Sequence, residues 1–260
     1  MANLLRFEFR KVFRSKYFYI LLGAAFLYTL LNGLTLYFVN WILENLAEEA
    51  GEAIDPGMFD YNSYTFTKAA LSGNLFMIVG IFIAIFTCED NGHGTSKNII
   101  AKGYSRLEVY FSKYIVSLLL TFVFALVAII AAALFGLIAW GADSFTKTDP
   151  NMLPIILGQL LCVIVYHALF FAVAFSIGRS GPAIVINILV PMGLSLLLAL
   201  GTVLVNRDDF SFANYWIDGI LTNFTGDTNT DLYLSNFILL FVYLALAELV
   251  GILIARKKQF

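Results

Sequence analysis

The chain has 260 residues, of which 60% are hydrophobic and only 13% are charged, and its mean hydropathy is +0.83. A soluble domain carries about 25% charged residues and could not bury this much apolar surface, so the composition excludes an ordinary soluble protein and indicates one embedded in lipid. The net charge of −2 points to no charged partner, and we expect no nucleic acid. Cys88 and Cys162 lack a C-x-x-C spacing, which argues against a disulfide framework or a metal site.

The N-terminal segment, residues 1–16, alternates apolar and basic positions in a helical pattern. One face carries Leu5, Phe9, Val12 and Phe13, and the rest carries Arg6, Arg10, Lys11 and Arg14. This pattern predicts a helix lying in the membrane interface, with aromatic rings at the acyl boundary and bases on lipid phosphates. The alternative is that the bases serve only to set the topology.

Six continuous apolar stretches are long enough to cross the roughly 30 Å of hydrocarbon in a bilayer, which takes about 20 helical residues. They are residues 17–42, 69–87, 114–141, 153–177, 182–205 and 233–255. Because the runs are continuous rather than alternating, they favour helices over strands. The sequence therefore predicts an all-α integral membrane protein with one domain, 1–260, and six transmembrane helices.

The basic residues predict how these spans are oriented. All but three of the 16 Lys and Arg fall in the segments that lie on the same side as both termini, the exceptions being Lys68, Lys147 and Arg207. Basic residues concentrate on the cytoplasmic side of membrane proteins. We therefore expect both termini in the cytoplasm and a multi-pass protein of the plasma membrane.

The segment between the second and third spans is rich in helix-capping residues. Glu89 stands where the second helix should leave the bilayer, and Gly94 interrupts the helix soon afterwards. Thr95 can then cap a new short helix over 95–102, which Gly103 can end. A short cytoplasmic helix between two membrane helices is suited to receive a push from a soluble partner, although a simple structured loop fits the residues equally well.

Two later features carry open alternatives. Pro191, with Gly193 close by, should kink the fifth span, and a kinked helix can gate a pathway, although proline is also common in membrane helices without that role. The outer segment 206–232 contains the run Tyr215, Trp216 and Ile217. This run predicts either a short re-entrant or interfacial turn, or a loop with a few packed aromatic side chains.

Glu248, His167 and Asn187 stand out among the polar side chains inside the predicted spans. Glu248 is the only Asp, Glu, Lys or Arg in the spans, and an acid at a helix centre is unfavourable by about 2.5–3.5 kcal/mol on insertion scales. It could act in a transport pathway or in coupling, or it could form a packing hydrogen bond. His167 and Asn187 are more typical of interhelical hydrogen bonds than of ligand contacts.

The capping segment also resembles a motif of the type-2 family of ABC-transporter permeases. The matching residues are Glu89, Gly94, Thr95, Asn98, Ile99, Ile100, Gly103, Ser105 and Arg106. The basic amphipathic start, the six spans and the chain length are similar too. The resemblance implies a bacterial exporter in which two permease chains, identical or different, pair in the membrane.

The same resemblance implies how energy reaches the permease. Each permease chain would bind a separate cytoplasmic ATP-binding cassette ATPase through a coupling helix, here 95–102, and through the N-terminal helix. ATP and Mg would then bind in that partner, because this chain lacks the phosphate-binding sequence G-x-x-x-x-G-K-[ST]. We expect no cofactor and no catalytic residue in the chain itself.

Two other classes of protein compete with a permease as interpretations of the sequence. A membrane enzyme, such as an intramembrane protease or lipid transferase, needs clustered acids, His or Ser near one leaflet, and the spans offer only Glu248 and His167. A secondary transporter or substrate-capture subunit usually has interrupted helices in matched halves and more intramembrane charge. The halves of this chain do not match.

Overall fold

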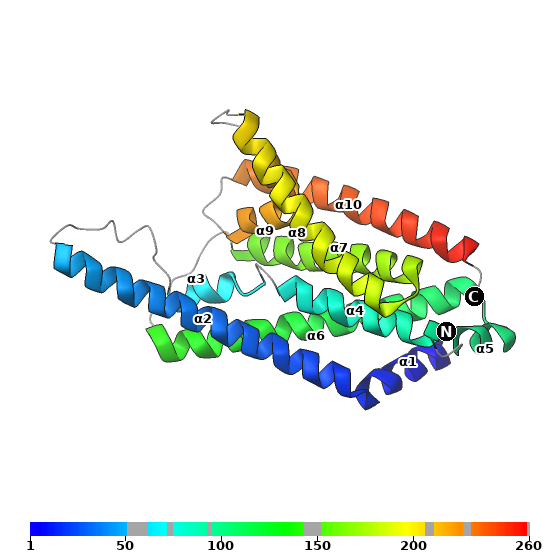
Figure 1. Cartoon of the computed structure of the whole chain (residues 1–260). Coiled ribbons are helices and arrows are strands. Elements are labelled where there is room, and N and C mark those ends of the chain that lie inside the picture. The colour runs from blue at the N-terminus through cyan, green and yellow to red at the C-terminus, as the bar shows by residue number, and fades with distance from the viewer. Residues whose placement is uncertain are drawn as a thin grey trace.

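The computed structural model describes residues 1–50, 62–71, 75–92, 95–142, 152–205, 211–225 and 230–258. Within these ranges all regular structure is helical, as the sequence predicts. Five described helices are long and apolar enough to cross a membrane. They are α2 (Lys16–Ala50), α6 (Arg106–Trp140), α7 (Met152–Ile177), α8 (Ser180–Val205) and α10 (Thr230–Lys257), and they form an elongated bundle (Figure 1). The chain is thus a multi-pass membrane protein.

The second predicted span differs from the expected window of 69–87. Its helix, α4, runs over Leu75–Gly92 and is about 27 Å long at the rise of an α-helix, which is short for a crossing. Leu75–Asp90 is long and apolar enough for a span only when it is taken together with the next helix, Thr95–Ala101. The two helices are bent by 55° relative to each other. The described residues therefore contain five candidate spans, or six if this bent pair counts as one.

The residues just before α4 form a short helix that hydropathy could not reveal. Helix α3 (Ser63–Lys68) begins with a capping box, in which Asn62 and Thr65 each accept a hydrogen bond from the other's backbone. The Ser63 hydroxyl donates to the Gly136 carbonyl of α6 at 2.7 Å. These polar residues are typical of a loop in sequence, yet here they fix α3 to the C-terminal part of α6.

Helix α6 also begins earlier than its predicted span of 114–141. Ser105 and Glu108 form a capping box: the Glu108 amide donates to the Ser105 hydroxyl at 3.1 Å, and the Ser105 amide donates to the Glu108 carboxylate at 2.8 Å. The helix therefore starts at Arg106. As a result Lys113, which the sequence placed in the loop, lies inside a helix.

Aromatic side chains fill the centre of the bundle. Phe82 of α4, Phe124 of α6 and Phe171 of α7 are completely buried, and the rings of Phe82 and Phe124 lie 5.1 Å apart. Helix α7 packs against α4, α6, α8 and α10. In lipid the packing must come from such close contacts, because lipid tails are as apolar as the side chains.

The segment between α8 and α10 contains a helix packed into the bundle. The short helix η3 (Phe212–Tyr215) is followed by α9 (Ile217–Thr225), whose Ile217, Ile220 and Phe224 are completely buried and which packs against α7. The turn between η3 and α9 is so tight that a Cβ at Gly219 would collide with the Ala213 carbonyl oxygen. The described part of this segment is thus helical, and its apolar side chains pack into the bundle.

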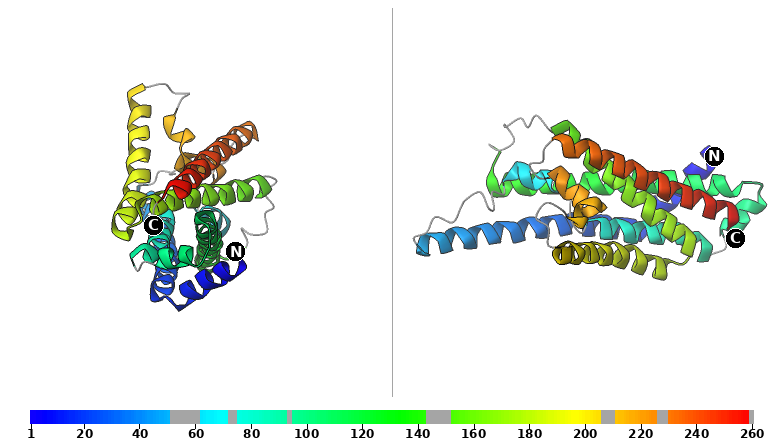
Figure 2. Two further views of the ribbon diagram at one scale, coloured as in Figure 1. Left: turned by 90° about the vertical axis from the view of Figure 1, so that its right-hand side faces the viewer. Right: turned by 90° about the horizontal axis from the view of Figure 1, so that it is seen from above.

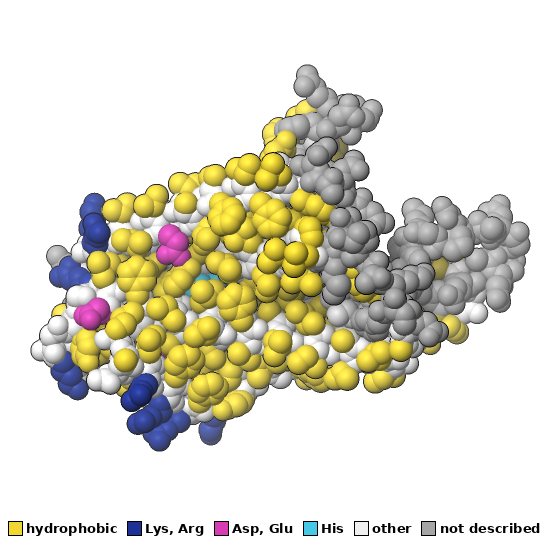
Figure 3. All heavy atoms as spheres, turned by 180° about the vertical axis from the view of Figure 1, so that it is seen from behind, with side chains coloured by type: hydrophobic (Ala, Val, Ile, Leu, Met, Phe, Trp, Pro, Cys, Tyr) yellow, Lys and Arg dark blue, Asp and Glu magenta, His cyan; other side chains and the backbone are white. Residues whose placement is uncertain are grey.

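One end of the bundle carries both termini, α1 (Ala2–Arg14) and α5 (Thr95–Ala101) (Figure 1). Viewed along the bundle, α1 lies across this end rather than parallel to the long helices (Figure 2, left). On the face seen in Figure 3, Lys and Arg gather at this end while hydrophobic side chains cover the flank. We call it the basic end.

Candidate functional site

The inner face of α1 differs from the face predicted by the apolar pattern. Leu4, Glu8 and Val12, one helical turn apart, are buried against the bundle. Phe13 is 52% exposed, and Phe9 is half-buried. Arg6, Arg10 and Arg14 are exposed and point away from this inner face. The helix therefore packs through a stripe that includes an acid. This is possible because the acid, Glu8, meets a buried basic partner in the bundle.

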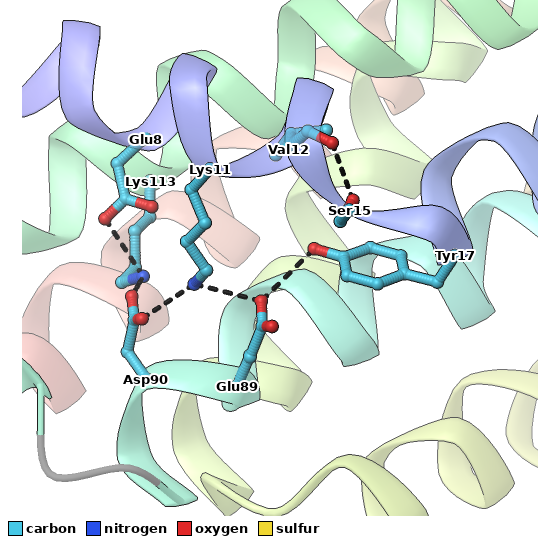
Figure 4. A network of polar contacts seen from close by, with 8 residues as sticks. All are labelled: Glu8, Lys11, Val12, Ser15, Tyr17, Glu89, Asp90 and Lys113. Carbon is cyan, nitrogen blue, oxygen red and sulfur yellow. Dashed lines mark hydrogen bonds and ion pairs between the residues drawn. The ribbon is translucent and has the colours of Figure 1, made fainter.

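The partner is Lys113 of α6, whose side chain is completely buried. Its Nζ lies 3.1 Å from Oε1 of Glu8 and forms a second ion pair with Asp90 at the end of α4. Both acids are also buried. Figure 4 shows the three side chains pointing toward one another from three different helices, α1, α4 and α6. Lys113 thus ties these helices together at the basic end.

A second lysine extends the network. Lys11 of α1 lies 2.7 Å from Asp90 and 3.1 Å from Glu89, and the Tyr17 hydroxyl donates to Glu89 at 3.3 Å (Figure 4). We call Glu8, Lys11, Glu89, Asp90 and Lys113 the charge clamp. The clamp joins α1 and the start of α6 to the last turn of α4. It therefore holds in place the two helices that flank α5 in the chain, α4 before it and α6 after it.

The clamp contains three acids and two lysines in a region largely closed to water. Burial raises the pKa of the Glu8 carboxyl, an effect that the neighbouring Lys113 opposes. Removing one partner of a buried ion pair typically costs about 3–5 kcal/mol, because the remaining charge is left without compensation. The clamp is therefore a rigid joint as long as all of its members are present.

Helix α5 is docked next to the clamp through one face. Ile99 is 8% exposed and packs with Leu4 of α1 and Val109 of α6. Gly103 ends the helix in a left-handed conformation (φ 93°), with its amide donating to the Ile100 carbonyl at 2.9 Å. The opposite face is exposed and consists of Lys97, Asn98, Ala101 and Lys102. We call these four residues the outer face of α5.

The residues of the sequence motif therefore separate into different environments. Glu89 belongs to the clamp, whereas Ile99 and Ile100 pack inward and Asn98 faces outward. Arg106 donates from Nη1 to the Arg256 carbonyl of α10 at 3.2 Å, and Thr95 is half-buried at the start of α5. Gly94, Lys147 and Arg207 lie outside the described residues.

Glu248, His167 and Asn187, the polar residues that the sequence singled out in the spans, lie on different helices. Nε2 of His167 lies 2.8 Å from the Ser117 hydroxyl, which links α7 to α6. Asn187 of α8 donates to the Gly80 carbonyl of α4 at 3.1 Å. Glu248 of α10 faces the phenols of Tyr110 and Tyr114 on α6. The structure does not bring these three residues together, and in the described part of the chain no group of three His, Cys, Asp or Glu side chains is placed to hold a metal ion.

Sequence reasoning missed three members of the clamp, Glu8, Asp90 and Lys113. Lys113 was missed because hydropathy placed the start of the third span one residue after it. A signal was nevertheless available: Leu4, Glu8 and Val12 share a helical spacing, so an acid stood in an otherwise apolar stripe. A buried acid needs a basic partner, and the capped helix beginning at Arg106 supplies one.

A multi-pass helical bundle with a clamped short helix at one end has the features of a membrane transport protein. The family model described as ABC-2 family transporter protein matches residues 4–201, and the chain belongs to that family. This match includes most of α1, the whole of α5 and every residue of the clamp. Neither the curated proteins nor the solved structures gave a significant match.

Proposed function

We propose that the chain is the permease subunit of an ATP-driven exporter, in which two permease chains pair and each binds a separate cytoplasmic ATPase. The observation that carries the proposal is α5, which is fixed by its inner face and exposes Lys97, Asn98, Ala101 and Lys102 at the basic end. Membership in the ABC-2 transporter family supports it. ATP and Mg would bind in the ATPase, and this chain would perform no chemistry of its own.

In this proposal the basic end faces the cytoplasm. The concentration of Lys and Arg around α1, α5 and the end of α10 supports this orientation, since basic residues are retained on the cytoplasmic side of membrane proteins. Only in this orientation could a soluble ATPase reach the outer face of α5.

The clamp gives α5 the rigidity that a coupling element needs. Ile99 fastens α5 to α1 and α6, while Asp90 and Lys113 fasten α4 to the same two helices. When the ATPase closes on nucleotide, a push on the outer face of α5 would therefore move α1, α4 and α6 as one body. Rigid-body movement of packed helices is a common way to open a route between two halves of a transporter.

Charge reversal on the outer face tests the ATPase contact. We expect tagged wild-type protein from native membranes to co-purify with a subunit that contains G-x-x-x-x-G-K-[ST], identified by mass spectrometry. Lys97→Glu with Lys102→Glu should reduce its recovery at least about tenfold, which corresponds to about 1.4 kcal/mol. Both lysines are exposed, so the thermal stability of the permease should not change.

The matched control reverses two other exposed charges at the same end, Arg256→Glu with Lys257→Glu at the end of α10. This variant should retain the ATPase at the wild-type level. Equal recovery of the ATPase with both double variants would contradict the proposed contact at α5.

A further inference from the structure

A cavity of about 680 Å³ lies between α4, α7, α8 and α9, away from the basic end. Its wall is mostly apolar and aromatic, with Phe76, Phe170 and Met192 among the lining residues. Five polar side chains also line it: Tyr166, Asn187, Ser195, Asp218 and Thr222. A largely apolar cavity with a few convergent polar groups is the usual form of a small-molecule site.

Asp218 lies deep in the membrane-spanning part of the bundle. The Tyr166 hydroxyl donates to its Oδ1, and the Ser195 hydroxyl donates to its Oδ2 at 2.5 Å. Tyr166 lies close to the middle of α7 (Met152–Ile177), roughly 15 Å or more of helix rise from either end. The first turn of α9 therefore brings a carboxylate near the level of the bilayer midplane, where ionisable groups are unfavourable and usually functional.

The polar groups of this cavity have unused capacity to accept hydrogen bonds. Among the described residues no Lys or Arg forms an ion pair with Asp218. Asn187 is only 2% exposed, and its Oδ1 has no hydrogen-bond partner. A carboxylate with two donors still offers acceptor sites, because each of its oxygens can accept more than one hydrogen bond. The cavity therefore favours a ligand that is positively charged or rich in donors.

The aromatic side chains favour the same kind of ligand. The rings of Phe76 and Tyr166 stack 4.3 Å apart at the cavity wall, and Tyr166 also contacts Phe170. Aromatic faces attract cations, most strongly where water is excluded. Apolar side chains of α8, including Leu189 and Leu196, complete the wall and suit a hydrocarbon chain.

We propose that this cavity binds an amphipathic substrate through an ammonium group, which pairs with Asp218 while its apolar part lies along α8. The inference rests on the proposed transport function and names the chemical class of the cargo. Asp218 lies beyond the residues 4–201 that match the family, so the family match does not assign this site.

Binding of dodecylammonium to the full chain in lipid nanodiscs tests the proposal, with empty nanodiscs correcting for partition into lipid. We expect saturable binding to the wild type, and no saturable binding of dodecyl sulfate. Asp218→Asn keeps the size and an acceptor oxygen but removes the charge, and it should weaken binding at least about tenfold. Glu248→Gln, which neutralises the acid of α10 outside the cavity, should bind like the wild type.

A second variant covers the case in which Asp218→Asn does not fold. Met192 is 50% exposed on α8, so Met192→Trp should fold and fill the cavity while leaving Asp218 in place. It should also abolish dodecylammonium binding. Unchanged binding in Met192→Trp, or in a folded Asp218→Asn, would overturn the proposal.

Competition identifies the natural source of the ammonium group. If the cargo is a lipid, nanodiscs that contain phosphatidylethanolamine should reduce dodecylammonium binding. If the cargo is a peptide, a short amphipathic peptide should displace dodecylammonium only when the amino terminus of the peptide is free. Either result supports the ammonium site. Because no ATPase is present, a negative result here leaves the α5 contact intact, and loss of the ATPase leaves this measurement unaffected.

Discussion

Lys113→Met is expected to lower the stability of the protein more than the substitution of any other lysine that the structure describes. The substitution leaves Glu8 and Asp90 buried without their shared cation, and breaking a buried pair in this way costs about 3–5 kcal/mol. The measurement is the thermal unfolding midpoint in one detergent. Lys102→Met, at an exposed position directly after α5, is the control and should shift stability by no more than about 0.5 kcal/mol.

The charge clamp also predicts a rescue. Adding Glu8→Gln and Asp90→Asn to Lys113→Met removes the two uncompensated acids and should recover much of the lost stability, because neutral polar groups are far less costly to bury than charges. If Lys113→Met is as stable as Lys102→Met, or if the triple variant is no better than the single one, the clamp does not hold α1, α4 and α6 together.

Ile99→Asp is expected to release α5 from the bundle. Ile99 is buried against Leu4 and Val109, and even truncating a buried Ile to Ala costs about 2–5 kcal/mol. Because this cluster is small and lies at the edge of the bundle, the loss should appear as local opening rather than global unfolding. Hydrogen exchange of the amides in 95–101 should therefore become much faster, while exchange in α7 should not change.

This prediction separates docking of α5 from recognition of the ATPase. Ile99→Asp should lose the ATPase because α5 is no longer held in place, whereas Lys97→Glu with Lys102→Glu should lose it with α5 still protected from exchange. Protection of α5 in Ile99→Asp at the wild-type level would show that Ile99 does not anchor the helix.

The sequence predicted the elements whose physical signals are local. Long apolar runs located the helices α2, α6, α7, α8 and α10, and glycine and capping residues located α5 and its end at Gly103. Each of these signals depends only on neighbouring residues in the chain. For the same reason, the ends of the spans were less accurate than their centres.

What could not be predicted depends on contacts between distant segments. The clamp joins residues about 80 to 105 positions apart, Lys11 to Asp90 and Glu8 to Lys113, so no window of sequence contains it. Asp218 has a polar, loop-like neighbourhood in sequence, yet α9 carries it to the middle of α7. Hydropathy records how apolar a segment is, and it does not record how deeply a polar segment inserts between helices.

The most direct test of the account is labelling of Asn98→Cys on the outer face of α5 with a membrane-impermeant maleimide. Cys88 and Cys162 are buried, and replacing both with Ala gives a clean background. Asn45→Cys, at the exposed far end of α2, is the control for the opposite side. We predict that Asn98→Cys reacts only in inverted vesicles and is protected by the bound ATPase, while Asn45→Cys reacts in intact cells. Labelling of Asn98→Cys from outside intact cells would contradict the account, because no cytoplasmic ATPase could then reach α5.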